Sequence, residues 1–201
     1  MLTFAAAVFF LIITPGPGVL STAGVGSAFG RAAGSRYVGG LFIGQNLVSV
    51  AVISGLAAIV LADARLRTVL FLLSVAYLFY LAARIALAGS RLAFIRRSRA
   101  PGVLGGVALQ VINPKAYAVN TTLFTGFSFL ADDLFLETAI KLLIMNAIWI
   151  PIHFLWLWAG IRLGQLDLPE RVHRTINIGM ALSMLLVVAL AILAQLRPFA
   201  A

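Results

Sequence analysis

Two short motifs place proline, glycine and polar side chains inside otherwise apolar stretches. The first is Thr14-Pro15-Gly16-Pro17 and the second is Asn113-Pro114-Lys115. Proline has no backbone N–H and clashes with the carbonyl one turn earlier, so each motif predicts a helix break with unpaired backbone groups. In an apolar environment such groups need protein partners, water or a ligand. The motifs therefore predict a site for the amine and carboxylate of a small zwitterion, with two packing kinks as the alternative.

Lys115 is a charged residue within an apolar stretch. A charge at the centre of a bilayer costs roughly 2.5–3.5 kcal/mol on insertion scales, which suggests a role. Its ammonium could pair with a substrate carboxylate or bind carbonyls freed by Pro114. It could also extend to the membrane surface along its own helix.

Polar side chains continue after the second motif at helical spacing. Asn113, Tyr117, Thr121, Thr125 and Ser128 recur at intervals of three and four residues, which predicts one shared helix face. Such a face either lines a water-filled path or bonds to neighbouring helices. We expect it to line a path.

Other polar residues are expected near the same cavity. Gln45 and Asn46 follow Gly40-x-x-x-Gly44, whose glycines predict close helix approach. His153 is a candidate for carrying a coupled proton, because imidazole titrates near neutral pH, and an interhelical hydrogen bond is the alternative. The candidate substrate-binding residues are Thr14, Pro15, Gly16, Pro17, Gln45, Asn46, Asn113, Pro114, Lys115, Tyr117 and Thr121.

No residue pattern indicates a catalytic, metal or cofactor site. Cysteine is absent, and the acidic residues fall at the ends of the apolar stretches, so we expect neither a metal nor a cofactor. Ser49, Ser54 and Ser74 accompany His153, but no nucleophile motif surrounds them. We therefore expect no enzyme.

The composition indicates that these motifs lie in membrane helices. Hydrophobic residues make up 62% of the chain and charged residues 10%, whereas a soluble domain carries about 25% charged residues. A spanning helix needs about 20 mostly apolar residues. Six segments qualify, at about Leu2–Ala23, Val38–Ala62, Val69–Leu87, Gly106–Leu130, Thr138–Leu163 and Ile178–Leu196.

The two halves of the chain, about 1–99 and 100–201, resemble each other. Pro15 and Pro114 are 99 residues apart, and each opens a half with three apolar segments. Because three is odd, the second half must lie inverted in the membrane, as in many secondary transporters with interrupted helices. We predict an all-α membrane protein, a single domain 1–201 with six transmembrane helices in two inverted-topology three-helix repeats, whose first and fourth helices are broken. A chance match of two prolines is the alternative.

The basic residues predict the orientation. Nine of them lie in the connections after the first, third and fifth segments, and four lie on the opposite side. The positive-inside rule then places these odd connections in the cytoplasm and both termini outside. The longest connection holds Arg91, Arg96, Arg97 and Arg99. Basic residues in short gaps meet phospholipid headgroups, so we expect the lipid bilayer as a partner and no nucleic acid.

These features resemble those of the LysE/RhtB family of bacterial amino-acid exporters. The similarity is carried by Thr14-Pro15-Gly16-Pro17 and by Asn113-Pro114-Lys115-Ala116, with support from Gly40–Gly44 and Ala76–Leu81, and it spans essentially the whole chain. The chain departs from the family pattern at Gly18, Gln45 and Val119, which are positions expected to set the substrate or the ion coupling.

The resemblance implies a transporter that exports amino acids or close derivatives across the bacterial cytoplasmic (inner) membrane. It further implies coupling to the proton gradient and a homo-oligomer, expected to be a homodimer. Because no acidic residue lies within the six predicted helices, we expect a small neutral amino acid. The alternatives are an exporter of basic amino acids, an exporter of another small solute or cation, and a non-transporting membrane scaffold.

Overall fold

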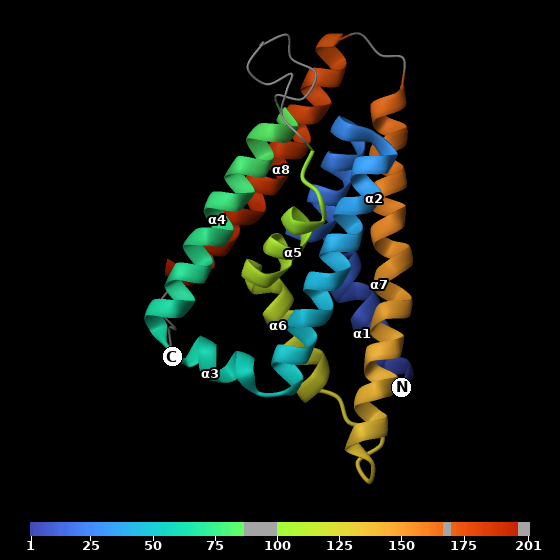
Figure 1. The fold of residues 1–201 in the computed structure, drawn as a ribbon, viewed down its shortest axis with the longest axis vertical. Helices are drawn as coiled ribbons and strands as arrows, with labels where there is room; N and C mark the ends of the chain where they lie inside the picture. Colours follow the sequence, from blue (N-terminus) through green and yellow to red (C-terminus); the bar gives the residue numbers. More distant parts are fainter. Residues whose placement is uncertain (87–99, 167–169, 197–201) are drawn as a thin grey trace.

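The computed structural model describes residues 1–86, 100–166 and 170–196, and every regular element in these ranges is an α-helix (Figure 1). In chain order the helices are α1 (Leu2–Ile13), α2 (Pro17–Ile53), α3 (Leu56–Ala62), α4 (Ala64–Ala86), α5 (Val103–Ile112), α6 (Pro114–Thr125), α7 (Leu134–Gln165) and α8 (Glu170–Leu196). The four arginines of the longest predicted connection lie outside the described residues.

Helix α2 is a hairpin of two arms, 17–29 and 31–53, joined at Gly30. Gly30 has φ 75° and ψ −173°, a conformation that glycine adopts without steric cost. The Tyr37 hydroxyl donates to the Ser21 hydroxyl at 3.0 Å, sixteen residues earlier. In a straight helix these two residues would be about 24 Å apart along the axis. Figure 1 shows the chain reversing direction at this turn.

Glycines bring the second arm of α2 against α5. A Cβ on Gly40 would lie 2.0 Å from the Val103 carbonyl oxygen, and a Cβ on Gly106 would lie 2.4 Å from the Tyr37 carbonyl oxygen. A Cβ on Gly44 would likewise lie 2.7 Å from the neighbouring helix. These backbones therefore touch only because both helices carry glycine, which confirms the close approach predicted at Gly40 and Gly44.

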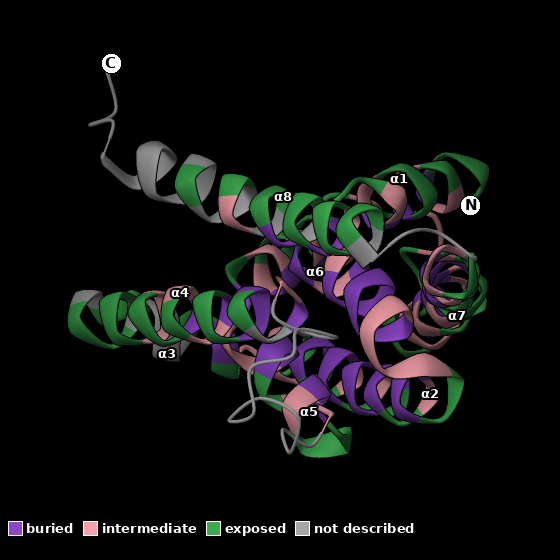
Figure 2. Ribbon diagram, turned by 90° about the horizontal axis from the view of Figure 1, so that it is seen from above, coloured by how far each residue is buried: buried purple, intermediate pink, exposed green. Residues whose placement is uncertain are grey.

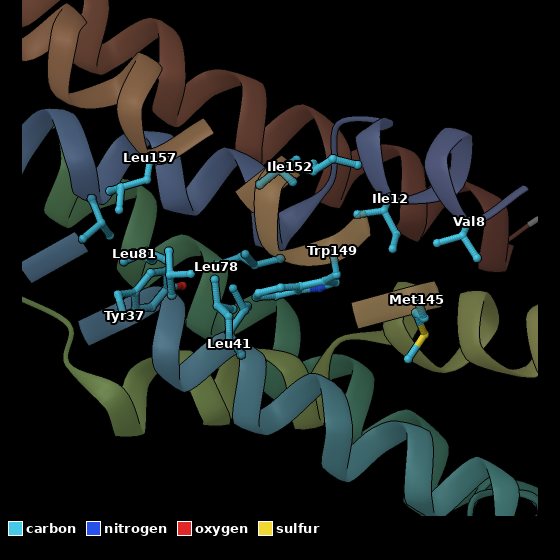
Figure 3. Close-up of a cluster of buried hydrophobic side chains, with 14 of the residues drawn as sticks. Val8, Ile12, Tyr37, Leu41, Leu78, Leu81, Met145, Trp149, Ile152 and Leu157 are labelled. Carbon is cyan, nitrogen blue, oxygen red and sulfur yellow. The ribbon is translucent and has the colours of Figure 1, made fainter. Parts of the chain in front are cut away.

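The core lies where the α2 hairpin, α5, α6 and α7 meet, and α4 packs along α8. In Figure 2 the buried residues gather between these helices, and the outer faces are exposed. Tyr37, Leu41, Leu81, Trp149 and Leu157 belong to the buried apolar cluster (Figure 3). This core fixes α7 and the α2 hairpin relative to each other.

The outer surface is strongly apolar. Leu2, Leu104 and Phe135 are each more than four-fifths exposed, and many other large apolar side chains point outward. Extended apolar surface of this kind marks contact with a membrane or with another protein. Two helices, α2 and α7, are long and apolar enough to cross a membrane, judged by length and composition.

Several predicted boundaries are corrected by the structure. Both predicted helix breaks are confirmed, at Thr14–Gly16 and at Asn113. The predicted segment Val38–Ala62 is wrong at its end, because the helix stops at Ile53 and Gly55, with φ 75°, starts a separate short helix. The predicted segment Gly106–Leu130 is too long, because helix α6 ends at Thr125.

Candidate functional site

The two helix breaks lie against each other in space, although about a hundred residues separate them. The Lys115 ammonium, at the start of α6, donates a 2.7 Å hydrogen bond to the carbonyl of Thr14, at the end of α1. The Lys115 stem runs over Gly16, where a Cβ would lie 2.9 Å from Cδ of the lysine. A charged donor is a strong partner for a carbonyl that has lost its helical N–H. Lys115 therefore joins the two breaks.

The first break leaves backbone N–H groups without partners. Helix α2 starts after Gly16 with no side-chain cap. The N–H groups of Gly16, Gly18 and Val19 donate to no other group among the described residues. The first N–H groups of a helix point along its axis and favour an anion at its N-terminus. This end of α2 is therefore suited to a carboxylate.

The second break is satisfied by its own side chains. The Asn113 side chain accepts a hydrogen bond from the Lys115 N–H at 3.1 Å and so caps α6. The Asn113 carbonyl accepts from the Ala116 N–H at 3.0 Å. The Tyr117 hydroxyl donates at 2.7 Å to the carbonyl of Val111. Because these backbone groups are paired, the second break contributes the Lys115 side chain to a ligand site and not unpaired backbone groups.

A cavity with about 420 Å³ of empty space, part of it open to the outside, lies at the junction of the breaks. Its walls come from α1, α2, α5, α6 and α7. The polar groups in the wall belong to Gln45, Gln110, Asn113, Lys115 and His153, together with the backbone of the first break. Lys115 is the charged residue of this wall, and no carboxylate of the described residues lines it.

His153 presents a ring nitrogen to the cavity. Its ring stacks on Trp149, with centroids 3.5 Å apart, and its Nδ1 lies 3.0 Å from the Trp149 carbonyl oxygen. A carbonyl only accepts, so we assign the proton to Nδ1, which leaves Nε2 of the neutral ring as an acceptor. Nε2 lies 3.4 Å from where a Cβ of Gly18 would be and has no partner among the described residues. The ring is 3% exposed, so its free nitrogen faces the cavity rather than the outside.

Buried amides behind the cavity form a continuous chain. Asn113 donates to Gln110 at 3.1 Å, and Gln110 donates to Gln45 at 3.0 Å. Gln45 donates to Asn120 at 3.3 Å, and Ser49 donates to the same oxygen at 2.7 Å. All five side chains are buried. Buried polar groups that are mutually paired fix each other's orientation, so this chain holds the cavity wall.

Six of the predicted site residues line the cavity. They are Thr14, Gly16, Gln45, Asn113, Lys115 and His153. Pro15, Pro17 and Pro114 shape the two breaks without forming its wall. Gln110 and Trp149 also line the cavity but were not among the predicted residues. Gln110 lies one helical turn before Asn113 in an apolar stretch, and that spacing was a usable signal.

Three predicted site residues lie elsewhere. Thr121 is exposed, as is Thr125, whose hydroxyl donates to the Thr121 carbonyl. The predicted polar face of α6 therefore does not line this cavity, and Asn120 is the fully buried polar residue of that helix. Tyr117 binds the Val111 carbonyl outside the cavity wall, as noted above.

Asn46 is the third of these residues. It forms a reciprocal pair with Asn146, with N···O distances of 3.2 and 3.0 Å. The pair joins the second arm of α2 to α7 and does not line the cavity.

A buried ion pair lies away from the cavity. Lys141 and Glu137, one turn apart on α7, are 2.7 Å apart, and both are almost fully buried. Glu137 accepts from the N–H groups of Phe129 and Leu130. Lys141 donates to the carbonyl of Phe124, in the last turn of α6, and to that of Phe127, just after the helix. The pair therefore holds the connection between α6 and α7. Glu137 lies in the first turn of α7, which agrees with an acidic residue at the end of an apolar stretch, but its side chain is buried in the protein.

No family model, curated protein or solved structure matches this chain. The chemistry of the cavity is therefore the basis for assigning a function.

Proposed function

We propose that this protein is a secondary transporter that exports a small neutral amino acid, or a close derivative, from the bacterial cytoplasm. The observation that carries the proposal is the cavity at the two helix breaks. Its wall holds the free N–H groups of α2 and the Lys115 ammonium as donors, and the free His153 nitrogen as an acceptor. Interrupted helices with these features are how transporters bind charged solutes inside a membrane.

The donors and acceptors of the cavity wall match the two charges of an amino acid. The carboxylate binds the N–H groups of Gly16 and Gly18 and the Lys115 ammonium, because all of these donate. The amine donates to Nε2 of His153 or to the side-chain oxygen of Gln110, which lines the same wall. A basic amino acid carries a second cation, and no carboxylate of the described lining residues could receive it. A neutral solute is therefore favoured.

The helices fit six membrane passes. The first consists of α1 and the first arm of α2, and the second is the other arm of α2. Helix α4 is the third pass, α5 with α6 the fourth, and α7 and α8 the last two. Each pass is then 20 residues or longer, the length that a bilayer requires.

The internal spacing supports two inverted halves. Pro15 and Pro114 are 99 residues apart, and each follows a short helix and precedes another. Asn46 and Asn146, 100 residues apart and so within one residue of the same offset, donate to each other. In a molecule with a pseudo-two-fold axis, equivalent residues meet only near that axis. The Asn46–Asn146 pair is therefore the expected position of the axis between the halves.

The departures from the exporter family are also informative. Gly18, Gln45 and Val119 all line the cavity. This placement supports a solute or a coupling that differs from those of other exporters with the same motifs. We assign His153 the coupled proton, because its ring can accept a proton at the free nitrogen and that nitrogen faces the cavity. The inner-membrane location, the external termini and the homodimer belong to the same proposal.

The direct test is efflux from proteoliposomes. Vesicles containing the purified protein are loaded with a panel of labelled amino acids, and loss of label is followed with and without an imposed pH gradient. Gly18→Leu should block efflux, because its side chain fills the cavity beside His153. Gly39→Leu is the matched control, because a Cβ there meets nothing within 4 Å. Retention of every amino acid by the intact protein, as in empty vesicles, would reject the proposal.

A further inference from the structure

A second hollow lies on the outer surface, separate from the cavity at the breaks. It has about 1130 Å³ of empty space, including space open to the surroundings. It runs between the second arm of α2, which contributes Arg31 and Ser35, and the last part of α7, which contributes Phe154, Trp158 and Arg162. We call it the arginine groove.

The groove carries positive charge. Arg31 and Arg162 are both exposed, and no carboxylate in the part of the chain that the structure describes forms an ion pair with either. The Arg162 guanidinium lies 5.4 Å from the centre of the Trp158 ring, which holds it over the groove. The C-terminal end of α7 contributes about half a negative charge, which two full positive charges outweigh. The part of the groove that Arg31 and Arg162 line is therefore suited to an anion.

The groove also extends from polar to apolar surroundings. The turn at Gly30 interrupts the helix, so in a membrane protein we expect it at the water interface, and Arg31 follows it directly. Arg162 lies at the matching end of α7, and Phe154 is eight residues deeper, about 12 Å along the helix. Trp158 lies between them and is 55% exposed. From the end with the arginines inward, the groove presents arginine, then tryptophan, then phenylalanine, and this order matches the headgroup, interface and hydrocarbon layers of a membrane.

We propose that the arginine groove binds an anionic phospholipid. The phosphate lies between Arg31 and Arg162, with the Ser35 hydroxyl in reach of the headgroup, and an acyl chain follows Phe154. Arginine recognises phosphate with paired N–H donors, and basic pockets between membrane helices bind anionic headgroups. The distribution of basic residues along the chain predicts that both arginines lie on the cytoplasmic side of the membrane. The inference rests on the membrane placement proposed above and not on the identity of the transported solute.

The experiment compares lipid retention by the purified protein in detergent, measured by native mass spectrometry. Phosphatidylglycerol is titrated against phosphatidylcholine for the intact protein and for Arg31→Gln and Arg162→Gln. Each variant should weaken phosphatidylglycerol retention about fivefold, because one basic residue near a lipid headgroup contributes on that scale. Arg36→Gln is the matched control, since Arg36 is exposed near Arg31 but does not line the groove.

A second measurement needs no change to an arginine. Phosphatidylglycerol with brominated chains should quench the fluorescence of the intact protein more than brominated phosphatidylcholine does, and Trp158→Phe should remove that difference. Equal retention of the two lipids would overturn the proposal. So would an equal loss in the Arg36 control, which would indicate unspecific attraction. Competition by glycerol 3-phosphate as effective as that by the lipid would show a phosphate site instead, and loss of a dimer in the groove variants would show that a second copy occupies it.

Discussion

Replacing Lys115 by methionine separates a ligand-binding role of the ammonium from a structural one. Methionine keeps an unbranched side chain over Gly16 but removes the charge and the 2.7 Å bond to the Thr14 carbonyl. That carbonyl lies in an exposed setting, so water can replace the lost donor. We therefore expect a small loss of stability, about 1 kcal/mol, or a melting temperature lower by about 2–4 °C.

The effect on solute binding should be larger. A hydrogen bond to a charged group contributes about 1.5–3 kcal/mol when its partner has no equal replacement. If the ammonium receives the solute carboxylate in the cavity, its removal should raise the KM for efflux about 10- to 100-fold. The assay is the initial rate of efflux from proteoliposomes as a function of internal solute concentration, combined with thermal unfolding of the same preparations.

Lys141 supplies the control, because it is the buried lysine without a place in the cavity. Its ammonium is 2.7 Å from the Glu137 carboxylate, and both groups are almost fully enclosed. Removing one member of a buried pair costs about 3–5 kcal/mol, so Lys141→Met should lower the melting temperature by roughly 6–20 °C and leave the KM of the folded fraction unchanged. The ligand-binding role of Lys115 is excluded if Lys115→Met leaves the KM unchanged and instead destabilises the protein as much as Lys141→Met does.

Three further changes test the packing, the coupling and the amide chain. Gly160→Ala would place a Cβ 2.1 Å from a backbone oxygen of α2. Unfolding in detergent should therefore show a loss of about 1–3 kcal/mol in the free energy of unfolding. Gly179→Ala is the control, because its Cβ meets no atom within 4 Å and should leave stability unchanged. His153→Gln cannot titrate, so the pH gradient should no longer accelerate efflux while exchange of labelled for unlabelled solute continues; an intact gradient effect would exclude the proton role. Gln45→Leu leaves the Gln110 amide without its acceptor, so thermal unfolding should show a loss of about 1–3 kcal/mol, and unchanged stability would mean that water or another group takes over.

The helix breaks were predictable because their cause is local. Pro15 and Pro114 each lack a donor wherever the surrounding chain is placed, and both breaks occur within two residues of the predicted motif. The close approach at Gly40 was predictable for a similar reason, since a Cβ there would lie only 2.0 Å from the Val103 carbonyl oxygen and glycine is the residue that has none. The hairpin at Gly30 was not recognised as one continuous element, because a single positive φ reverses the chain without any unstructured connection.

Which polar residue of α6 faces the interior could not be predicted from spacing. The count started at Asn113, but that residue has ψ 110° and lies outside the helix, so the break resets the direction of the residues after it. Thr125 also shows that a polar side chain in this helix need not face the interior, because its hydroxyl bonds to the Thr121 carbonyl of the same helix. Burial of Asn120 depends instead on Gln45 and Ser49, which come from α2 and are distant in sequence.

The proposed repeat explains why the cavity has one ammonium and one free helix end. With an offset of 99 residues, Gly16 corresponds to Lys115, and these two positions touch, since a Cβ on Gly16 would lie 2.9 Å from the lysine stem. Two lysines at these equivalent positions would compete for the same space and bring two positive charges together. Glycine at one position and lysine at the other let a single side chain cross between the halves. The same offset pairs Thr14 with Asn113, and only the asparagine caps its helix. In the proposed repeat, the differences between the two breaks therefore bring one ammonium to the free helix end, an arrangement suited to a carboxylate.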